Sequence, residues 1–200
     1  MIDLYRHKIL LISTVHSYYL TGYLAKLAEV IDVRTGGWGL SYADTTPYTE
    51  TTVTGILFLS TNLMFFWAGY SLYLSGNYLL AVSIIISGLA SFYYHYSQVH
   101  YGPYRDEVRL PLLIDYITAF ITINLTFFDT ILLLYKISNN INCDLTFTPI
   151  ILGSVSIFCL FGSWIFEYGF PYIILHGFWH IFSALSAASL GTQIMKSLCG

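Results

Sequence analysis

Charged residues are scarce in this 200-residue chain, and their scarcity indicates its class. Asp, Glu, Lys and Arg make up 10% of the residues, whereas soluble domains carry about 25%. None of these four types occurs between Glu50 and Arg105, or between Glu167 and Lys196. A soluble chain cannot leave stretches of that length without solvated charge. With 56% hydrophobic residues, the chain is predicted to be an integral membrane protein.

Cysteines and basic residues are also few, and each shortage removes a class of function. Cys143, Cys159 and Cys199 form no Cys-x-x-Cys pair and no even framework, so neither a disulfide scaffold nor a thiolate metal site is predicted. Eight basic residues and a net charge of -3 give no electrostatic footprint for nucleic acid. Membrane lipids are the expected partners instead.

Long apolar runs divide most of the chain into candidate membrane spans. A helix needs about 20 mainly apolar residues to cross the hydrocarbon core. Five clear runs meet this requirement, and turns or polar loops separate them: residues 53–74, 78–97, 110–135, 147–166 and 172–194. His100 is expected in the polar loop after the second run. The predicted fold class is all-α, a polytopic transmembrane helix bundle over residues 53–200.

Residues 1–52 form a separate region in this prediction. Residues 9–25 carry no charge but contain His16 and several hydroxyl groups, and Lys26 and Glu29 follow. Two readings of residues 9–31 stay open: a sixth span, or an interfacial helix. Residues 33–52 are expected to be an extramembrane loop.

Basic residues in the loops predict the orientation of the five spans. Because positive charge accumulates in cytoplasmic loops, the N-terminal side is expected to face the cytoplasm, or the matrix of a mitochondrion. The expected location is an endomembrane or the mitochondrial inner membrane. The N-terminal side carries six basic residues and the opposite side two: Arg6, Lys8, Lys26, Arg34, Arg105 and Arg109 against Lys136 and Lys196.

Ionisable side chains inside the spans are candidates for function, because they are costly to keep in a membrane. His95 ends the second run and Asp115 opens the third, so one loop places them on the same membrane side. The fourth run crosses away and the fifth returns, which brings His176 and His180 to that side as well. Asp129 lies about 21 Å deeper along the helix than Asp115 and is assigned to the far interface.

The spacing of the histidines is that of a metal site. His176 and His180 are four residues apart and share a helix face, and Ser91 precedes His95 by the same interval. Two imidazoles from one helix and a third from another match the three-histidine arrangement of catalytic zinc. The plain alternative is that these histidines only hydrogen-bond neighbouring helices. Their convergence with Asp115 favours the metal site.

Three motifs, in this order, resemble those of the CREST superfamily, which includes alkaline ceramidases, adiponectin and progestin receptors and myomaker-like proteins. Residues 90–95 (ASFYYH) resemble the S-x-x-x-H motif that ends its second helix. Residues 113–116 (LIDY) resemble the aspartate motif of the third helix, and residues 175–182 (LHGFWHIF) the closing H-x-x-x-H helix. Residues 59–63 (LSTNL) are similar to the first helix of myomaker-like members.

The resemblance implies a seven-helix fold with a zinc ion held by three histidines. Carried over to this sequence, the ligands are His95, His176 and His180. Asp115 is implied to orient or deprotonate the zinc-bound water, and Ser91 to hydrogen-bond near the metal. The implied chemistry is hydrolysis of a lipid amide or ester, such as a ceramide.

Two features depart from the family pattern. Sixty residues lie between Asp115 and His176, which leaves room for one span where the family has three. The site carboxylate also has a competitor, because Asp106 and Glu107 match the ceramidase spacing after the histidine of the second helix. The apolar surroundings of Asp115 favour it over these two.

Two functions therefore remain open at the level of sequence. The first is a zinc-dependent, ceramidase-like membrane hydrolase of a lipid amide or ester. The alternative is a non-catalytic structural or accessory subunit, derived from this family, whose partners are other membrane protein subunits. The apparent loss of two helices motivates the alternative.

Overall fold

The computed structural model describes residues 22–31, 34, 43–102, 106–138 and 146–198. The chain divides into two compact units, residues 1–41 and 42–200, and each is described by itself. In the first unit, residues 22–31 are helical. Residues 9–31 were predicted to form either a sixth span or an interfacial helix. The rest of this segment lies outside the described residues.

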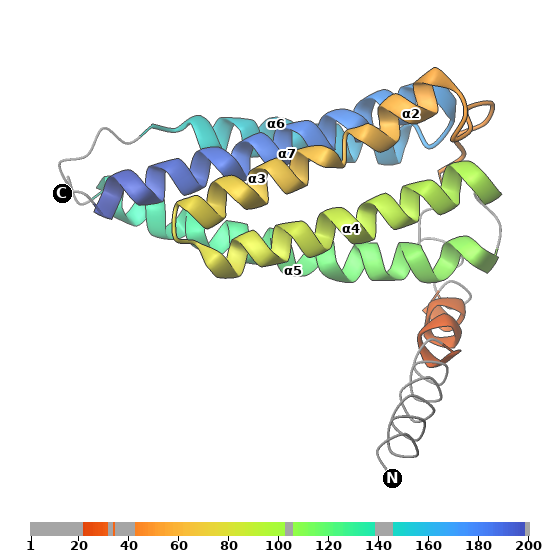
Figure 1. The fold of residues 1–200 in the computed structure, drawn as a ribbon, viewed down its shortest axis with the longest axis horizontal. Coiled ribbons are helices and arrows are strands. Elements are labelled where there is room, and N and C mark those ends of the chain that lie inside the picture. The colour runs from red at the N-terminus through yellow and green to blue at the C-terminus, as the bar shows by residue number, and fades with distance from the viewer. Residues whose placement is uncertain (1–21, 32–33, 35–42, 103–105, 139–145, 199–200) are drawn as a thin grey trace, which may run out of the picture. The chain divides into compact units, whose positions relative to one another are not determined.

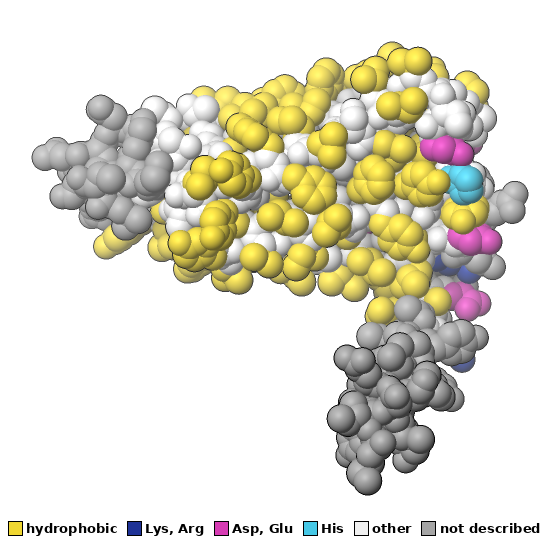
Figure 2. All heavy atoms as spheres, in the orientation of Figure 1, with side chains coloured by type: hydrophobic (Ala, Val, Ile, Leu, Met, Phe, Trp, Pro, Cys, Tyr) yellow, Lys and Arg dark blue, Asp and Glu magenta, His cyan; other side chains and the backbone are white. Residues whose placement is uncertain are grey.

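The second unit is a bundle of helices (Figure 1): α2 (Val53–Ser60), α3 (Leu63–Leu74), α4 (Tyr78–Tyr101), α5 (Asp106–Ser138), α6 (Thr148–Ile165) and α7 (Gly169–Leu198). Counting α2 and α3 together, five of its segments are long and apolar enough to cross a membrane. Hydrophobic side chains cover the flanks of the bundle in Figure 2, whereas the acidic side chains in view lie at one end. The predicted all-α bundle is confirmed.

Several helix boundaries differ from the prediction by a few residues, and two of them flank the connection between α4 and α5. The second span continues past Ser97 to Tyr101, so the prediction that His100 lies in a loop was wrong; it lies in the last turn of α4. The helix ends where Gly102 takes a positive φ of 81° and donates its N–H to the Gln98 carbonyl, a conformation that glycine adopts without strain. α5 begins at Asp106 and runs through Pro111, four residues earlier than predicted.

The first span is broken in the middle, where the apolar count predicts one helix. The side chains of Ser60, Thr61 and Asn62 each donate to the backbone carbonyl three residues earlier, at 2.6–3.1 Å. Such local bonds compete with the regular helical pattern, and α2 ends at Ser60 while α3 starts at Leu63. The break places the Thr61 hydroxyl against α7.

The order of packing brings three spans together around one end of the bundle. α7 packs against α6 and α3, α3 packs against α4, and α4 packs against α5. α2 contacts both α4 and α7, so the end of the bundle near α2 is enclosed by three helices. A buried cluster that includes Phe58, Val99 and Tyr172 fills this end.

Candidate metal centre

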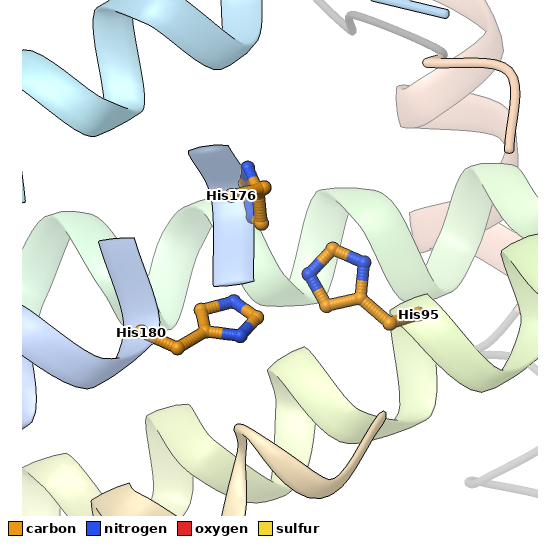
Figure 3. A group of neighbouring side chains, drawn as sticks. All are labelled: His95, His176 and His180. Atoms are coloured by element: carbon orange, nitrogen blue, oxygen red, sulfur yellow. The ribbon is translucent and has the colours of Figure 1, made fainter. Parts of the chain in front are cut away.

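The three histidines predicted as ligands converge in the structure. Figure 3 shows His95 of α4 and His176 and His180 of α7 with their rings facing a common centre. The ring centroids form a nearly equilateral triangle with sides of 4.8, 4.9 and 5.0 Å. One nitrogen of each ring lies within 4.8 Å of those of the other two. The sequence argument, which counts how often the chain crosses the membrane, therefore predicted this convergence correctly.

The side chain of Gln98 determines which nitrogen of His95 is free. The Gln98 amide nitrogen donates to the Ala43 carbonyl at 2.6 Å, which identifies the other amide atom as the oxygen. That oxygen lies 3.0 Å from Nδ1 of His95 and can only accept. His95 Nδ1 is therefore the N–H donor, and the lone pair of the ring is on Nε2.

The same reasoning shows which nitrogen carries the proton in His180 and His176. The Thr61 hydroxyl donates to a backbone carbonyl at 2.6 Å, so it accepts from Nδ1 of His180 at 2.8 Å. The Ser163 hydroxyl donates to a backbone carbonyl at 2.7 Å and accepts from Nδ1 of His176 at 3.1 Å. All three rings thus carry their proton on Nδ1 and their lone pair on Nε2. Outer hydrogen bonds of this kind are typical of metal-binding histidines.

A metal ion fits this donor set. His95 Nε2 is buried and has no hydrogen-bond partner within the described part of the chain, and such an unsatisfied atom is costly. Three imidazoles bound to one tetrahedral zinc ion at about 2.0–2.1 Å have ring centroids about 5.2 Å apart. The observed sides of 4.8–5.0 Å are close to that value. The triangle is therefore compatible with a bound metal ion.

Ser91 and Asp115 lie beside the histidines. The Ser91 hydroxyl is 3.3 Å from His180 Nε2 and lies beside the carboxyl group of Asp115, which is buried. A hydroxyl carries one proton, so it can donate to His180 or to an ionised Asp115, but not to both. A cation bound at Nε2 removes this conflict, because Ser91 is then free to donate to Asp115.

The other predicted carboxylates lie elsewhere. Asp106 is the first residue of α5, about 13.5 Å along the helix from Asp115, and Glu107 is exposed. Asp129 accepts a hydrogen bond of 2.6 Å from Asn77, in the turn between α3 and α4. That turn lies at the opposite end of α4 from His95, in agreement with the far position predicted for Asp129.

Aromatic rings enclose the histidine triangle. The Phe58 ring contacts all three imidazoles, with centroid distances of 4.7, 6.0 and 6.2 Å. Phe65 lies 5.4 Å from His180, and Tyr172 stacks on His176 at 5.1 Å. An apolar wall of this kind lowers the local dielectric constant, which strengthens electrostatic interactions inside it. It also holds each ring in one orientation.

Three residues of the site were missed at the level of sequence: Gln98, Thr61 and Ser163. The contact of Gln98 with His95 could have been predicted, because a residue three positions after His95 shares its helix face. Thr61 lies in the segment 59–63 that resembles myomaker-like members, but its contact with His180 could not be predicted, because the two residues are 119 positions apart and the contact depends on the helix break. The contact of Ser163 with His176 could not be predicted either, because it depends on the turn between α6 and α7.

No family model, curated protein or solved structure matches the chain. The function is therefore inferred from the geometry of the site.

Proposed function

We propose that this chain is an integral-membrane hydrolase of a lipid amide or ester, ceramidase-like in its chemistry and dependent on zinc. The observation that carries the proposal is the convergence of three Nε2 lone pairs beside a buried carboxylate. Three neutral imidazoles without a thiolate suit zinc, and they leave a fourth position open for chemistry. The motif resemblance to the CREST superfamily supports the same assignment.

The residues of the site have separable roles in this mechanism. Zinc supplies a Lewis acid that polarises a carbonyl and makes water nucleophilic near neutral pH. His95, His176 and His180 hold the ion, and Asp115 accepts a proton from the attacking water. As the carbonyl carbon gains the water oxygen and loses its bond to nitrogen or oxygen, Asp115 returns the proton to the leaving group. Ser91, which lies beside Asp115, orients its carboxylate.

The depth of the site favours a lipid substrate. The three histidines lie six to eleven residues from the helix ends on the same side of the bundle, which is about 9–17 Å along the helix axes. This depth lies within a hydrocarbon core of about 30 Å. The acyl linkage of a membrane lipid comes close to this depth, which supports a lipid substrate.

Metal content and turnover test the proposal together. We expect about one zinc per purified chain, loss of the metal in His180→Ala, and its retention in His100→Ala, a histidine outside the cluster. Asp115→Asn should keep the metal but lose hydrolysis of a fluorescent ceramide in vesicles by about 10²–10⁴-fold. A purified chain without any transition metal would overturn the proposal.

One observation favours a second candidate, a non-catalytic structural or accessory subunit of a larger membrane complex. Only 6% of the apolar window of α5 is buried within the bundle, which leaves much surface for partner helices. The histidine triangle would then hold a structural metal. Turnover of an acyl lipid by the isolated chain, abolished by Asp115→Asn, would reject this candidate.

A further inference from the structure

α5 has two different faces, and only one of them is used within the bundle. The Thr122 hydroxyl is 2.7 Å from the Ser83 hydroxyl of α4, so this face packs inward. Asn124 is two residues later, at about 160° around the helix from Thr122 by the 3.6-residue turn, and is exposed. The outward face of α5 therefore has no neighbour among the described residues of this unit that covers it.

The outward face carries a regular heptad pattern. Ile117, Asn124 and Ile131 recur at intervals of seven, and a second set recurs three positions later: Phe120, Phe127 and Leu134. The five apolar members are 40–69% exposed. This spacing matches the a and d positions of a coiled-coil seam, where each side chain inserts between those of a facing helix. A seam of this kind predicts a second helix packed along α5.

Asn124 is the polar member of the seam and lies near the middle of the span. Its side-chain nitrogen donates to the Phe120 carbonyl of its own helix at 2.7 Å. The second N–H and the oxygen of the Asn124 amide also need hydrogen-bond partners, because a polar group without a partner is costly in hydrocarbon. An asparagine in this setting gains by hydrogen-bonding across a helix interface. Because an amide both donates and accepts, two copies of Asn124 can satisfy each other.

We propose that the outward face of α5, defined by Ile117, Phe120, Asn124, Phe127, Ile131 and Leu134, binds the same face of a second copy of this chain. Two copies in one membrane have the same orientation, so a twofold axis along the membrane normal makes their α5 helices parallel and in register. One asparagine at an a position fixes the register of such a helix pair. This inference is independent of the metal centre.

Dimerisation of the full chain in lipid bilayers tests the proposal, with energy transfer between labelled copies measured as the lipid dilution increases. Asn124→Leu removes the amide and keeps the apolar seam, and the dissociation constant should rise about three- to thirtyfold. Ser154→Ala is the matched control, because Ser154 is also exposed and bonds a carbonyl of its own helix. This variant should dimerise like the wild type.

Cysteine cross-linking tests the register, in a chain whose three native cysteines are replaced by serine. Ile131→Cys should form a disulfide with its own copy, whereas Leu132→Cys, equally exposed but off the seam, should not. Circular dichroism confirms that each variant keeps its helices. A wild-type chain that is monomeric in bilayers would overturn the proposal. So would an Asn124→Leu variant that dimerises like the wild type, or equal cross-linking at the two cysteine positions.

Discussion

The Gln98 amide oxygen accepts a hydrogen bond from Nδ1 of His95, three residues earlier on α4, at 3.0 Å. Gln98 is fully buried, and its amide nitrogen is bound to the Ala43 carbonyl in the segment ahead of α2. Gln98 therefore cannot turn away from His95 without breaking a second buried hydrogen bond. We infer that Gln98 is a positioning residue, which holds the His95 lone pair toward the centre of the triangle.

Gln98→Ala should weaken metal binding without removing a ligand. The variant leaves the His95 N–H without its acceptor, so the ring can rotate or change tautomer. Loss of such an outer partner typically lowers metal affinity about 10–100-fold. Competition between the purified chain and a zinc chelator of known affinity measures the change.

Gln193→Ala is the matched control for this measurement. Gln193 is also a buried glutamine, but it bonds Thr146 near the opposite end of α7. Its removal should leave the metal affinity unchanged. Equal losses in the two variants would show that Gln98 acts only through general stability.

Gly88→Ala should destabilise the bundle through overpacking. A Cβ atom at Gly88 would lie 2.7 Å from Cβ of Phe65, so α3 and α4 would have to move apart. Overpacking of this kind typically costs about 1–3 kcal/mol. Because the Phe65 ring contacts His180, the metal affinity should fall as well.

Gly177→Ala provides the comparison on α7, between the two histidines. A Cβ atom there would lie 3.5 Å from the nearest atom of Thr61, an ordinary contact. The variant should therefore be as stable as the wild type, measured by thermal unfolding in detergent. Equal destabilisation of the two variants would contradict the packing argument.

Glu50 and His100 form a pair outside the histidine triangle, and its strength should depend on pH. His100 Nδ1 is 2.8 Å from a Glu50 carboxyl oxygen, and this hydrogen bond holds the pKa of Glu50 below its ordinary range. The stabilisation from Glu50 is thus fully present above its unfolded-state pKa of about 4.3. It is lost as the pH falls through the lowered pKa of the folded state.

His100→Phe tests this pair while keeping an aromatic ring against Tyr96, on which His100 stacks. Without the hydrogen bond, the pKa of Glu50 should rise toward its ordinary range. Carbon NMR of the labelled carboxyl group over a pH titration measures the midpoint. A midpoint that is the same in both proteins would contradict the assigned cause.

Much of the site could be predicted from sequence because membrane crossing restricts the arrangement of helices. Apolar runs long enough to span must alternate in direction, so their order determines which ends share a membrane side. That rule placed His95, Asp115 and the α7 histidines at one end of the bundle. The 3.6-residue turn then placed His176 and His180 on one helix face.

The choice among carboxylates required the tertiary structure. All three candidate carboxylates follow His95 within twenty positions: Asp106, Glu107 and Asp115. The ceramidase spacing matched the first two, whereas the aspartate motif of the third helix matched Asp115. Packing of α5 on α4 brings only Asp115, among the carboxylates that the structure describes, to Ser91. Helix rotation about its own axis depends on side-chain packing with the neighbouring helix, which apolar composition does not specify.

The sequence alone determined the membrane class, the five spans and the end of the bundle where the histidines meet, because these depend on hydrophobic length and on crossing order. The tertiary structure decided the tautomers of the three imidazoles, through Gln98, Thr61 and Ser163. It also decided where the first span breaks, since that depends on local hydrogen bonds between Ser60 and Asn62. These features arise from short-range contacts between helices or within one turn, which hydrophobic patterning does not encode.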